Sequence, residues 1–248
     1  MKRYLLFISL LLILTVSYGV SGQAAPVSHT QLTELLKKHV AADGQLNYKG
    51  FRKDSVQLNQ YLKLLSNNPP QKSWSREDQL AYWINAYNAF TVQLILRHYP
   101  LESIKDIGSK IKIPFVNTPW DIKFIRIGKE MFDLNNIEHS ILRDKFKEPR
   151  IHFAIVCASV SCPRLLNEAF VGNRINQQLD AQARDFINDK SRNRVTANAV
   201  QLSQIFNWFR GDFTRNGTLT DYINRYSSVK INKNAKISYL DYNWALNE

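Results

Sequence analysis

The segment SREDQLAYWINAYNAFTVQLILRHYP, residues 75–100, constrains the fold more than any other part of the chain. Ser75 predicts a helix cap, Glu77 and Asp78 favour the positive end of a helix, and Pro100 ends it. Between these signals the segment is apolar almost all round. A helix of this kind has no side that prefers water, so we expect it to lie at the centre of the molecule.

The segments on either side of this helix predict more helices and a few short strands. Apolar residues recur with the helical period in residues 28–40, 51–66, 133–146, 172–190 and 202–213. Alternating apolar and polar residues predict hairpins that turn at Gly128 and Asn198, and strands over residues 150–157 and 236–243. Helices and strands do not alternate regularly, so we expect a single α+β domain with several helices packed around a small, mainly antiparallel sheet.

The N-terminus predicts export. Two basic residues precede an uncharged, mostly apolar run over residues 4–16, which is too short to span a bilayer and is typical of a signal peptide. Val20 and Gly22 are small residues that suit cleavage before Gln23. We expect residues 1–22 to be a signal peptide and the mature protein to be periplasmic or secreted, with no integral membrane segment. An uncleaved N-terminal anchor is the alternative.

The rest of the chain is long enough for one domain with a substantial core. Residues 23–70 predict an N-terminal helical segment, which the sequence NNPP joins through a turn to a core of residues 71–248. The formal net charge is +12, but the basic residues are scattered and form no run of five or more. This pattern argues against nucleic acid as a partner. An acidic polymer of the cell envelope would suit the charge, which could also serve solubility alone.

Five segments resemble one known family in their order and spacing. They are AYWINAYNAF (81–90), FDLNNIEHSILR (132–143), PRIHFAIVCASVSCPRL (149–165), LSQIFNWFRGDF (202–213) and ISYLDYNWALN (237–247). The chain is similar in these segments to the domain of unknown function 547 family, and to its exported bacterial members in particular. The resemblance implies a shared fold over about residues 75–247. It implies no reaction, so the roles of residues have to be argued from chemistry.

The chain has two cysteines, and both lie in RIHFAIVCASVSCPR, residues 150–164. Catalysis by a cysteine needs a thiolate, a nearby imidazole and a group that orients the imidazole. On a regular strand, alternation would place His152 and Cys157 on opposite faces, unless a bulge intervened. His139, on the helix predicted over residues 133–146, is therefore the expected base.

Either cysteine is a candidate nucleophile. Cys162 precedes Pro163, and a helix that began there would lower the pKa of the Cys162 thiol. Cys157 would lie at the end of the predicted strand, where it could equally be an ordinary core residue. Backbone N–H groups around residues 161–164 are the expected oxyanion hole.

The remaining candidates would assist the base or the substrate. Asn85 and Asn88 share one face of the central helix and are the expected groups that orient His139, with Asp212 and Asn243 as looser options. Glu138 is also a candidate, although it should point about 100° away from its neighbour on an α-helix. The expected substrate-binding residues are Arg150 and Arg164, which suit a carboxylate, and His152.

The same residues could serve other chemistries. Cys157 and Cys162 could form a structural disulfide, although two cysteines are too few for a disulfide scaffold. His139 and His152 could bind zinc together with both cysteines, but the spacing matches no standard zinc motif. A tyrosine-phosphatase loop needs five residues between cysteine and arginine, and six separate Cys157 from Arg164. Serine-hydrolase, nucleotide and dinucleotide motifs are absent from the sequence, and we expect no cofactor.

Two functions follow, and the sequence leaves both open. The first is a cysteine-dependent hydrolase or acyl transferase that acts on an amide or ester in the cell envelope, with a papain-like layout of catalytic groups. The second is a non-enzymatic envelope binding domain whose buried polar residues only fix the fold. Under either function we expect Trp208, Tyr242 and Trp244 to be core residues.

Overall fold

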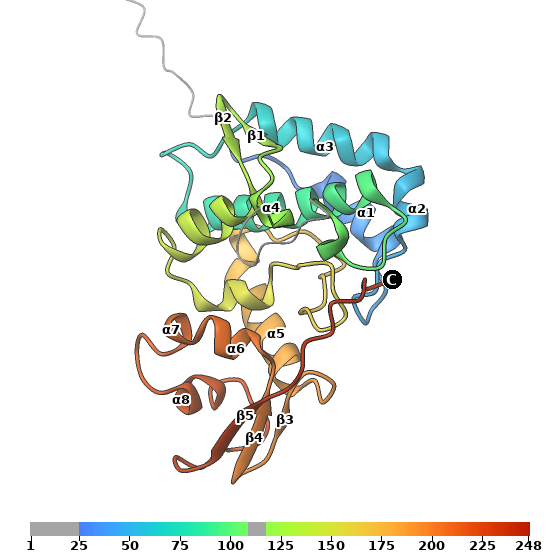
Figure 1. Ribbon diagram of the computed structural model, residues 1–248. Coiled ribbons are helices and arrows are strands. Elements are labelled where there is room, and N and C mark those ends of the chain that lie inside the picture. The colour runs from blue at the N-terminus through green and yellow to red at the C-terminus, as the bar shows by residue number, and fades with distance from the viewer. Residues whose placement is uncertain (1–24, 109–117) are drawn as a thin grey trace, which may run out of the picture.

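A computed structural model describes residues 25–108 and 118–248 of the chain (Figure 1). The predicted signal peptide, residues 1–22, lies outside the described residues. Within the described residues, no helix is long and apolar enough to cross a membrane.

The long helix α4 (Arg76–His98) lies at the centre of the helical half of the molecule, as the sequence predicts. The Ser75 side chain caps it by accepting a hydrogen bond from the backbone N–H of Asp78 at 3.0 Å. Its side chains are buried from Leu80 to Ile95 with few breaks. The other helices of this half are α1 (Thr30–His39), α2 (Tyr48–Lys53), α3 (Ser55–Asn67), η3 (Asn136–Arg143) and η5 (Gly172–Arg174). Of these, α2, α3, η3 and η5 contact α4 directly.

The strands form two small sheets. Strands β1 (Ile125–Ile127) and β2 (Glu130–Phe132) make an antiparallel hairpin that turns at Gly128, where φ is +61°. A second sheet contains β3 (Arg194–Val195), β4 (Ala199–Leu202) and β5 (Lys236–Tyr239). Both predicted hairpins and the late strand are confirmed, as is the α+β class. The β4–β5 pair is parallel, so the second sheet is mixed.

The second sheet packs with α5 (Ile175–Asn188), α6 (Ile205–Trp208), α7 (Arg210–Phe213) and α8 (Leu219–Ile223) in the lower half of Figure 1. This half has its own apolar cluster, in which the Phe153 ring meets Phe186, Phe206 and Phe213 at centroid distances of 5.2 to 5.7 Å. Ile151, two residues before Phe153, belongs to the cluster around α4. The segment that leads to the cysteines therefore runs between the two clusters.

The prediction of a strand over residues 150–157 is wrong. Pro149–Phe153 form a 3₁₀ helix, η4, and an irregular loop follows. Pro149 suits the first position of a helix because its missing N–H needs no partner there. Beyond η4, the Asn88 amide donates to Ala154 O at 2.9 Å and accepts from Val156 N–H at 3.0 Å. One side chain thus satisfies backbone groups that a neighbouring strand would otherwise bind.

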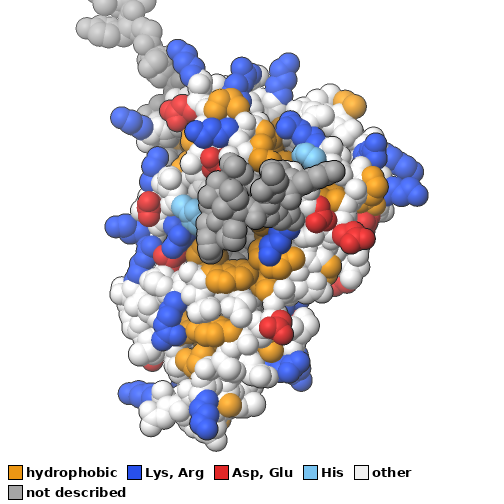
Figure 2. Space-filling view, in the orientation of Figure 1, with side chains coloured by type: hydrophobic (Ala, Val, Ile, Leu, Met, Phe, Trp, Pro, Cys, Tyr) orange, Lys and Arg blue, Asp and Glu red, His pale blue; other side chains and the backbone are white. Residues whose placement is uncertain are grey.

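The molecular surface mixes charge types. On the face shown in Figure 2, Lys and Arg side chains are spread among hydrophobic and acidic ones rather than gathered in one patch.

Candidate functional site

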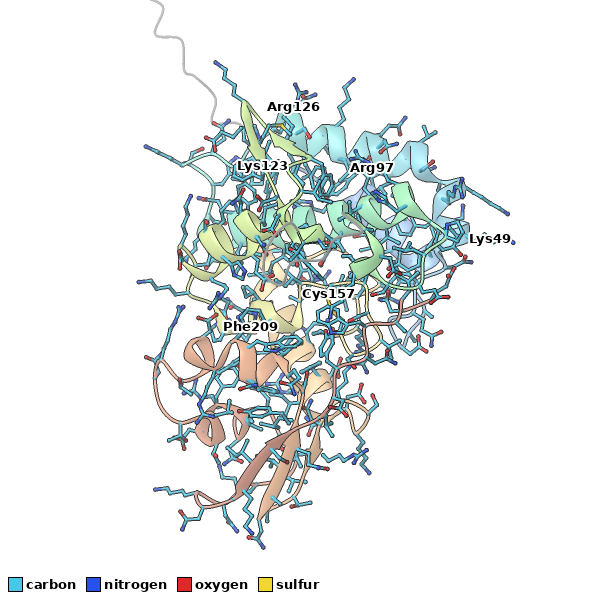
Figure 3. The ribbon with its side chains drawn as sticks, viewed as in Figure 1. Lys49, Arg97, Lys123, Arg126, Cys157 and Phe209 are labelled. Carbon is cyan, nitrogen blue, oxygen red and sulfur yellow. The ribbon has the colours of Figure 1, made fainter. Side chains whose placement is uncertain are left out.

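A cavity of about 200 Å³ opens between α4 and α6, and both cysteines line it. Its other lining residues come from segments far apart in the sequence: Tyr87, Trp120, Asn135, Glu138, His139, His152, Ile155, Val156, Pro163, Ile205, Trp208, Phe209, Tyr242 and Trp244. Figure 3 labels Cys157 and Phe209 in this central region. We call this cavity the thiol pocket. It contains four of the residues expected to act together, namely both cysteines, Glu138 and His139.

The two sulfur atoms of the thiol pocket lie side by side. Cys157 Sγ is 2.6 Å from Cys162 Sγ, and both cysteines are free thiols. Cys162 Sγ also accepts a hydrogen bond from the backbone N–H of Cys157 at 2.8 Å. Between them Ala158 has φ +56°, a left-handed conformation that costs a non-glycine residue about 1 kcal/mol. This turn reverses the chain and brings the two sulfurs together.

The environment of the pair shifts the pKa values of the two thiols in opposite directions. Burial acts to raise the pKa of Cys162, but hydrogen bonds from the Cys157 thiol and N–H outweigh it and lower the pKa to about 7. Burial raises the pKa of Cys157 well above its ordinary value. Above about pH 7 we therefore expect the pair to hold one proton, shared between the Cys157 and Cys162 sulfurs. The lowered pKa was predicted, but its cause was not, because no helix begins at Pro163.

Two hydroxyl groups lie close to the sulfur of Cys157, the less buried of the two cysteines. Cys157 Sγ lies 3.2 Å from Tyr242 Oη and 3.2 Å from Ser159 Oγ. Burial raises the pKa of Tyr242 well above its ordinary value, so its hydroxyl stays protonated and can donate to a thiolate. The sequence placed Tyr242 in the core and missed this contact. The one available signal was its position in a segment that carries the family resemblance, residues 237–247.

Glu138 gives the thiol pocket a carboxyl group with an unusual pKa. Burial raises its pKa to about 7, against the opposing effects of the Arg143 charge and of a hydrogen bond from Tyr87. The Tyr87 hydroxyl donates to Glu138 Oε2 at 3.3 Å. Glu138 and its neighbour His139 both line the pocket, although an α-helix would turn them apart. They lie on η3, which is a π-helix, a form that often occurs at functional sites.

His152 connects Glu138 to a second carboxylate. His152 Nε2 lies 2.8 Å from Asp212 Oδ2, and His152 Nδ1 lies 4.0 Å from Glu138 Oε1. Its ring stacks on Phe209 at a centroid distance of 4.0 Å. Burial lowers the pKa of His152 to about 4, so the imidazole is neutral. A neutral ring that donates through Nε2 to Asp212 has its acceptor, Nδ1, facing Glu138.

Asp212 is held as a carboxylate by cations. Arg143 Nε lies 2.6 Å from Oδ2, and Arg215 Nη2 lies 2.7 Å from Oδ1. Burial alone would raise the pKa of Asp212, but hydrogen bonds from His152 and Arg143 hold it well below its usual range. Asp212 thus orients His152, and not His139 as the sequence reasoning allowed.

His139 has a different role from the predicted one. Its Nδ1 lies 2.9 Å from Arg143 Nη1, which can only donate, so Nδ1 accepts and Nε2 carries the proton. Burial and the Arg143 charge lower the pKa of His139. A neutral imidazole with an N–H on its free side suits binding a substrate oxygen better than deprotonating a thiol.

The two asparagines of α4 clamp loops. Asn85 donates to Phe170 O at 2.8 Å and accepts from Phe170 N–H at 2.9 Å. Asn88 makes the equivalent pair of bonds to the backbone just before Cys157. Asn243 braces the cysteine loop through its backbone, since its carbonyl accepts from Ser161 N–H at 3.2 Å. These amides position the pocket walls, while Arg143 is the group that meets His139.

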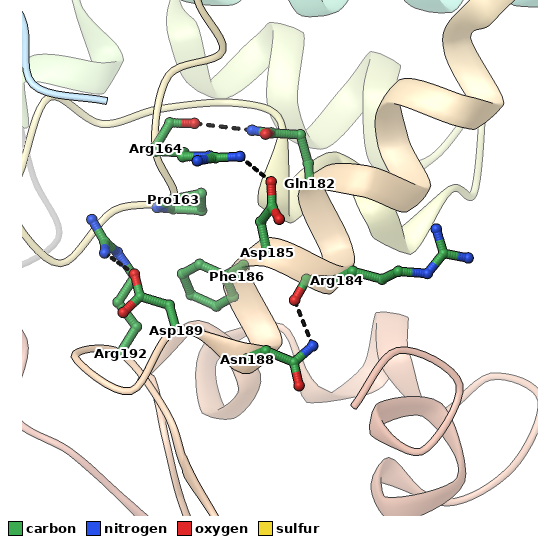
Figure 4. Close-up of a pocket in the computed structure, with 9 residues that line it drawn as sticks. All are labelled: Pro163, Arg164, Gln182, Arg184, Asp185, Phe186, Asn188, Asp189 and Arg192. Carbon is green, nitrogen blue, oxygen red and sulfur yellow. Dashed lines mark hydrogen bonds and ion pairs between the residues drawn. The ribbon is translucent and has the colours of Figure 1, made fainter. Parts of the chain in front are cut away.

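The two arginines expected to bind substrate are engaged in ion pairs outside the thiol pocket. Arg150 Nη2 lies 2.6 Å from Glu148 Oε2, and its Nη1 lies 2.8 Å from Asp180 Oδ1. Arg164 pairs with Asp185 on the wall of a second cavity, of about 430 Å³, shown in Figure 4.

Most of the charged side chains that line this second cavity are paired with each other. Besides the Arg164–Asp185 pair, it is lined by Arg192, which pairs with Asp189 (Figure 4). Arg192 also donates from Nε to the carbonyl oxygen of Cys162 at 2.7 Å, so it supports the cysteine loop from behind.

Aromatic rings form one wall of the thiol pocket. Trp208 and Trp244 stack at a centroid distance of 5.8 Å and an interplanar angle of 24°, and Tyr242 lies 4.6 Å from Trp244. The Lys105 ammonium lies 3.8 Å from the centre of the Trp244 ring. Trp208 is 47 % exposed, so this ring is a surface residue and not the core residue that the sequence predicts.

The zinc alternative would need His139, His152 and both cysteines to be grouped around one metal ion. Across residues 25–108 and 118–248, no three or more His, Cys, Asp or Glu side chains are grouped so that they could hold a metal ion.

The model of a family described as "Protein of unknown function, DUF547" matches residues 71–187. This range contains both cysteines, Glu138 and His152, and it ends before Asp212 and Tyr242. No curated protein and no solved structure matches the chain.

Proposed function

The chain belongs to the DUF547 family, and because that membership assigns no reaction, we propose a function from the geometry of the thiol pocket. We propose that the protein is a cysteine-dependent acyl transferase or hydrolase that cleaves an ester or amide. The observation that carries this proposal is that two cysteine sulfurs 2.6 Å apart and the Glu138 carboxyl group, whose pKa burial raises to about 7, line the same cavity.

Cys157 is the nucleophile in this proposal. It is partly exposed, whereas Cys162 is only 3 % exposed. The Cys162 thiolate, 2.6 Å away, takes the proton of Cys157 as the Cys157 sulfur attacks the substrate carbonyl. The product of this step is a thioester between the acyl group and Cys157.

Glu138 is the acid and base of the reaction. A group whose pKa lies near the working pH can both give and take a proton efficiently. Protonated Glu138 donates to the leaving group, and the carboxylate then activates the water or acceptor that cleaves the thioester. His152 Nδ1, 4.0 Å from Glu138 Oε1, lies close enough to orient this carboxyl after a small movement, and Asp212 fixes the imidazole.

The walls of the pocket suggest the kind of acyl group. Trp208, Tyr242 and Trp244 offer flat apolar surfaces, and a cavity of about 200 Å³ suits a small apolar or ring-containing group. The free N–H of His139 is the group best suited to bind the carbonyl oxygen. We therefore place the scissile bond between His139 and Cys157.

The test is to trap the thioester. The protein is mixed with aryl esters and thioesters of small aliphatic and aromatic acids, and intact mass and peptide mapping locate any acyl group. We expect acylation of Cys157 in the native protein, none in Cys157→Ser, and slow turnover in Glu138→Gln. Val160→Ala, in the exposed part of the same loop, is the matched control and should acylate normally. Binding of these acids without acylation would instead favour the envelope binding domain.

We also propose that the protein is exported and that its substrate lies in the cell envelope. The support is the leader-like sequence of residues 1–22. N-terminal sequencing of the protein from its native cells should find Gln23 at the start. A chain that keeps its apolar leader inside the cell would contradict export and leave the acyl-transfer proposal untouched.

A further inference from the structure

The thiol pocket contains two sulfur atoms, and in the proposed acyl transfer the second of them, on Cys162, only accepts a proton. The chain has only two cysteines, and they lie with their Sγ atoms 2.6 Å apart. In acyl transfer a carboxylate or imidazole can take the proton of the nucleophile, so a second thiol is not needed for that task. What a second thiol adds is the capacity to form a disulfide.

The loop holds the two sulfurs close together in the reduced protein. The left-handed turn at Ala158 reverses the chain between them. Val160 N–H donates to Ala245 O at 2.9 Å, and Arg192 donates to the carbonyl oxygen of Cys162 at 2.7 Å. Because these contacts fix both sides of the loop, a bond between the sulfurs needs little movement of the backbone.

The two cysteines differ in their exposure to solvent. In thiol–disulfide exchange by a pair of cysteines, the attacking cysteine has to be more accessible to the external disulfide than the resolving one. Cys157 is partly exposed at the thiol pocket, next to the hydroxyl groups of Tyr242 and Ser159. Cys162 is only 3 % exposed. An external disulfide should therefore react faster with Cys157, and Cys162 then lies close enough to attack the sulfur of the mixed disulfide on Cys157.

We propose that the pocket carries a second activity, reversible thiol–disulfide exchange with a small disulfide, with Cys157 as the attacking and Cys162 as the resolving cysteine. The cavity of about 200 Å³ admits one arm of such a molecule against the aromatic wall. This activity uses the same sulfurs as acyl transfer but does not rest on it.

The exchange takes place in two balanced steps. In the first, the proton of Cys157 moves to the Cys162 thiolate, the Cys157 sulfur attacks a disulfide R–S–S–R, and RS⁻ leaves with the electron pair of the broken bond. In the second, the Cys162 thiol gives its proton to the departed RS⁻ or to the Glu138 carboxylate, and its sulfur attacks Cys157 Sγ. The mixed disulfide breaks and a second RS⁻ leaves. The two protein sulfurs are oxidised by two electrons, and the external disulfide is reduced to one thiol and one thiolate, which takes its proton from solvent.

One consequence links the two activities. The disulfide form has no thiolate and cannot form a thioester, so oxidation switches acyl transfer off and reduction restores it. The oxidation state of small thiols around the protein would then set the active fraction.

The test uses the full-length mature protein and oxidised glutathione, with intact mass and thiol counting as readouts. We expect the native protein to lose both thiols and two hydrogens without a persistent glutathione adduct, and to regain both thiols in reduced glutathione. Cys162→Ser should stop at the first step and keep one glutathione on Cys157. Cys157→Ser should form an adduct about tenfold more slowly or worse, because Cys162 is buried.

Three outcomes would overturn the proposal: both thiols surviving, a stable adduct on the native protein, or equal reactivity of the two single variants. The first two use the native protein and need no variant to fold. Since no acyl substrate is present, failure here leaves the acyl-transfer proposal standing, and the reverse also holds.

Discussion

His152 Nε2 lies 2.8 Å from Asp212 Oδ2, although 60 residues separate them along the chain. This contact joins η4, which leads to the cysteine loop, to α7, which belongs to the lower apolar cluster. It also sets the tautomer of His152 and so presents a hydrogen-bond acceptor toward Glu138. The acid–base group of the proposed reaction thus depends on contacts between both halves of the molecule.

Asp212→Asn should weaken this connection. The change removes the charge that Arg143 and Arg215 bind, and hydrogen bonds to charged groups contribute about 2 kcal/mol each at most sites. We expect the free energy of unfolding to fall by about 2 kcal/mol at pH 7, measured by denaturant titration. Because the folded-state pKa of Asp212 is depressed, its contribution is present above the unfolded pKa of about 4 and is lost as pH falls below it.

The pH dependence provides the control for Asp212. Native protein should lose stability below about pH 4 more steeply than Asp212→Asn. Asp221→Asn, which alters an exposed helix cap, should change stability by less than about 1 kcal/mol. A variant at Asp212 as stable as the native protein would show that the contact contributes nothing.

Glu138→Gln should slow acyl transfer without lowering the stability of the fold at neutral pH. Loss of the acid and base should slow acyl transfer by about 10²-fold or more. The folded-state pKa of Glu138 is raised to about 7, so the folded protein binds its proton more tightly than the unfolded chain does. Native stability should therefore decline as pH rises from about 4 to 7, and the uncharged variant should escape this decline.

Unfolding curves at pH 5 and pH 8 measure the effect at Glu138. Relative to the native protein, Glu138→Gln should have a higher free energy of unfolding at pH 8. At pH 5 the two free energies of unfolding should be more nearly equal. An equal difference at both values would mean that Glu138 does not titrate in this range.

Tyr242→Phe should slow reactions of the thiol pair without unfolding the protein. The hydroxyl group lies 3.2 Å from Cys157 Sγ, and a hydrogen bond of about 1 kcal/mol corresponds to about a fivefold change in an equilibrium. We expect alkylation by iodoacetamide at pH 7 to slow by about this factor. Tyr239→Phe, on the neighbouring strand β5, is the matched control. Equal slowing in both variants would show that the Tyr242 hydroxyl has no specific effect on the reactivity of Cys157.

Asn88→Ala should act mainly on folding. It leaves Ala154 O and Val156 N–H without their partner, and unsatisfied buried groups cost about 1 to 3 kcal/mol each. We expect a loss of about 3 kcal/mol in the free energy of unfolding. Gln93→Ala, which removes a side-chain hydrogen bond from α4 to Asn59 and leaves no backbone group without its partner, should cost less. A stable Asn88→Ala variant with a slowed reaction would instead restore the catalytic role predicted from the sequence.

The sequence predicted the parts of the fold that have strong local signals. The caps and the all-round apolar composition identify α4, and Gly128 marks a turn that needs positive φ. The prediction of a strand over residues 150–157 was wrong because a short, continuous apolar run has no periodicity that distinguishes a strand from a buried 3₁₀ segment. The deciding contact is the Asn88 amide, 68 residues away from Val156.

The structure brings five of the residues proposed from the sequence into one place and gives them contacts that the sequence does not show. Both cysteines, Glu138, His139 and His152 line one cavity. Their roles depend on Arg143, Asp212 and Tyr242, whose positions follow from the packing of distant segments. Arg150 and Arg164 looked free in sequence because their acidic partners become neighbours only in the folded chain, except for Glu148.

The most direct test of an activated thiol in the pocket is the pH dependence of alkylation in the folded, reduced protein. Iodoacetamide labelling is followed by peptide mapping, which separates the two cysteines. We expect Cys157 to be labelled first, with a rate that rises through a midpoint near pH 7, because the pair loses its first proton there. Labelling of both cysteines with a midpoint near that of a free cysteine, about 8.5, would contradict the account.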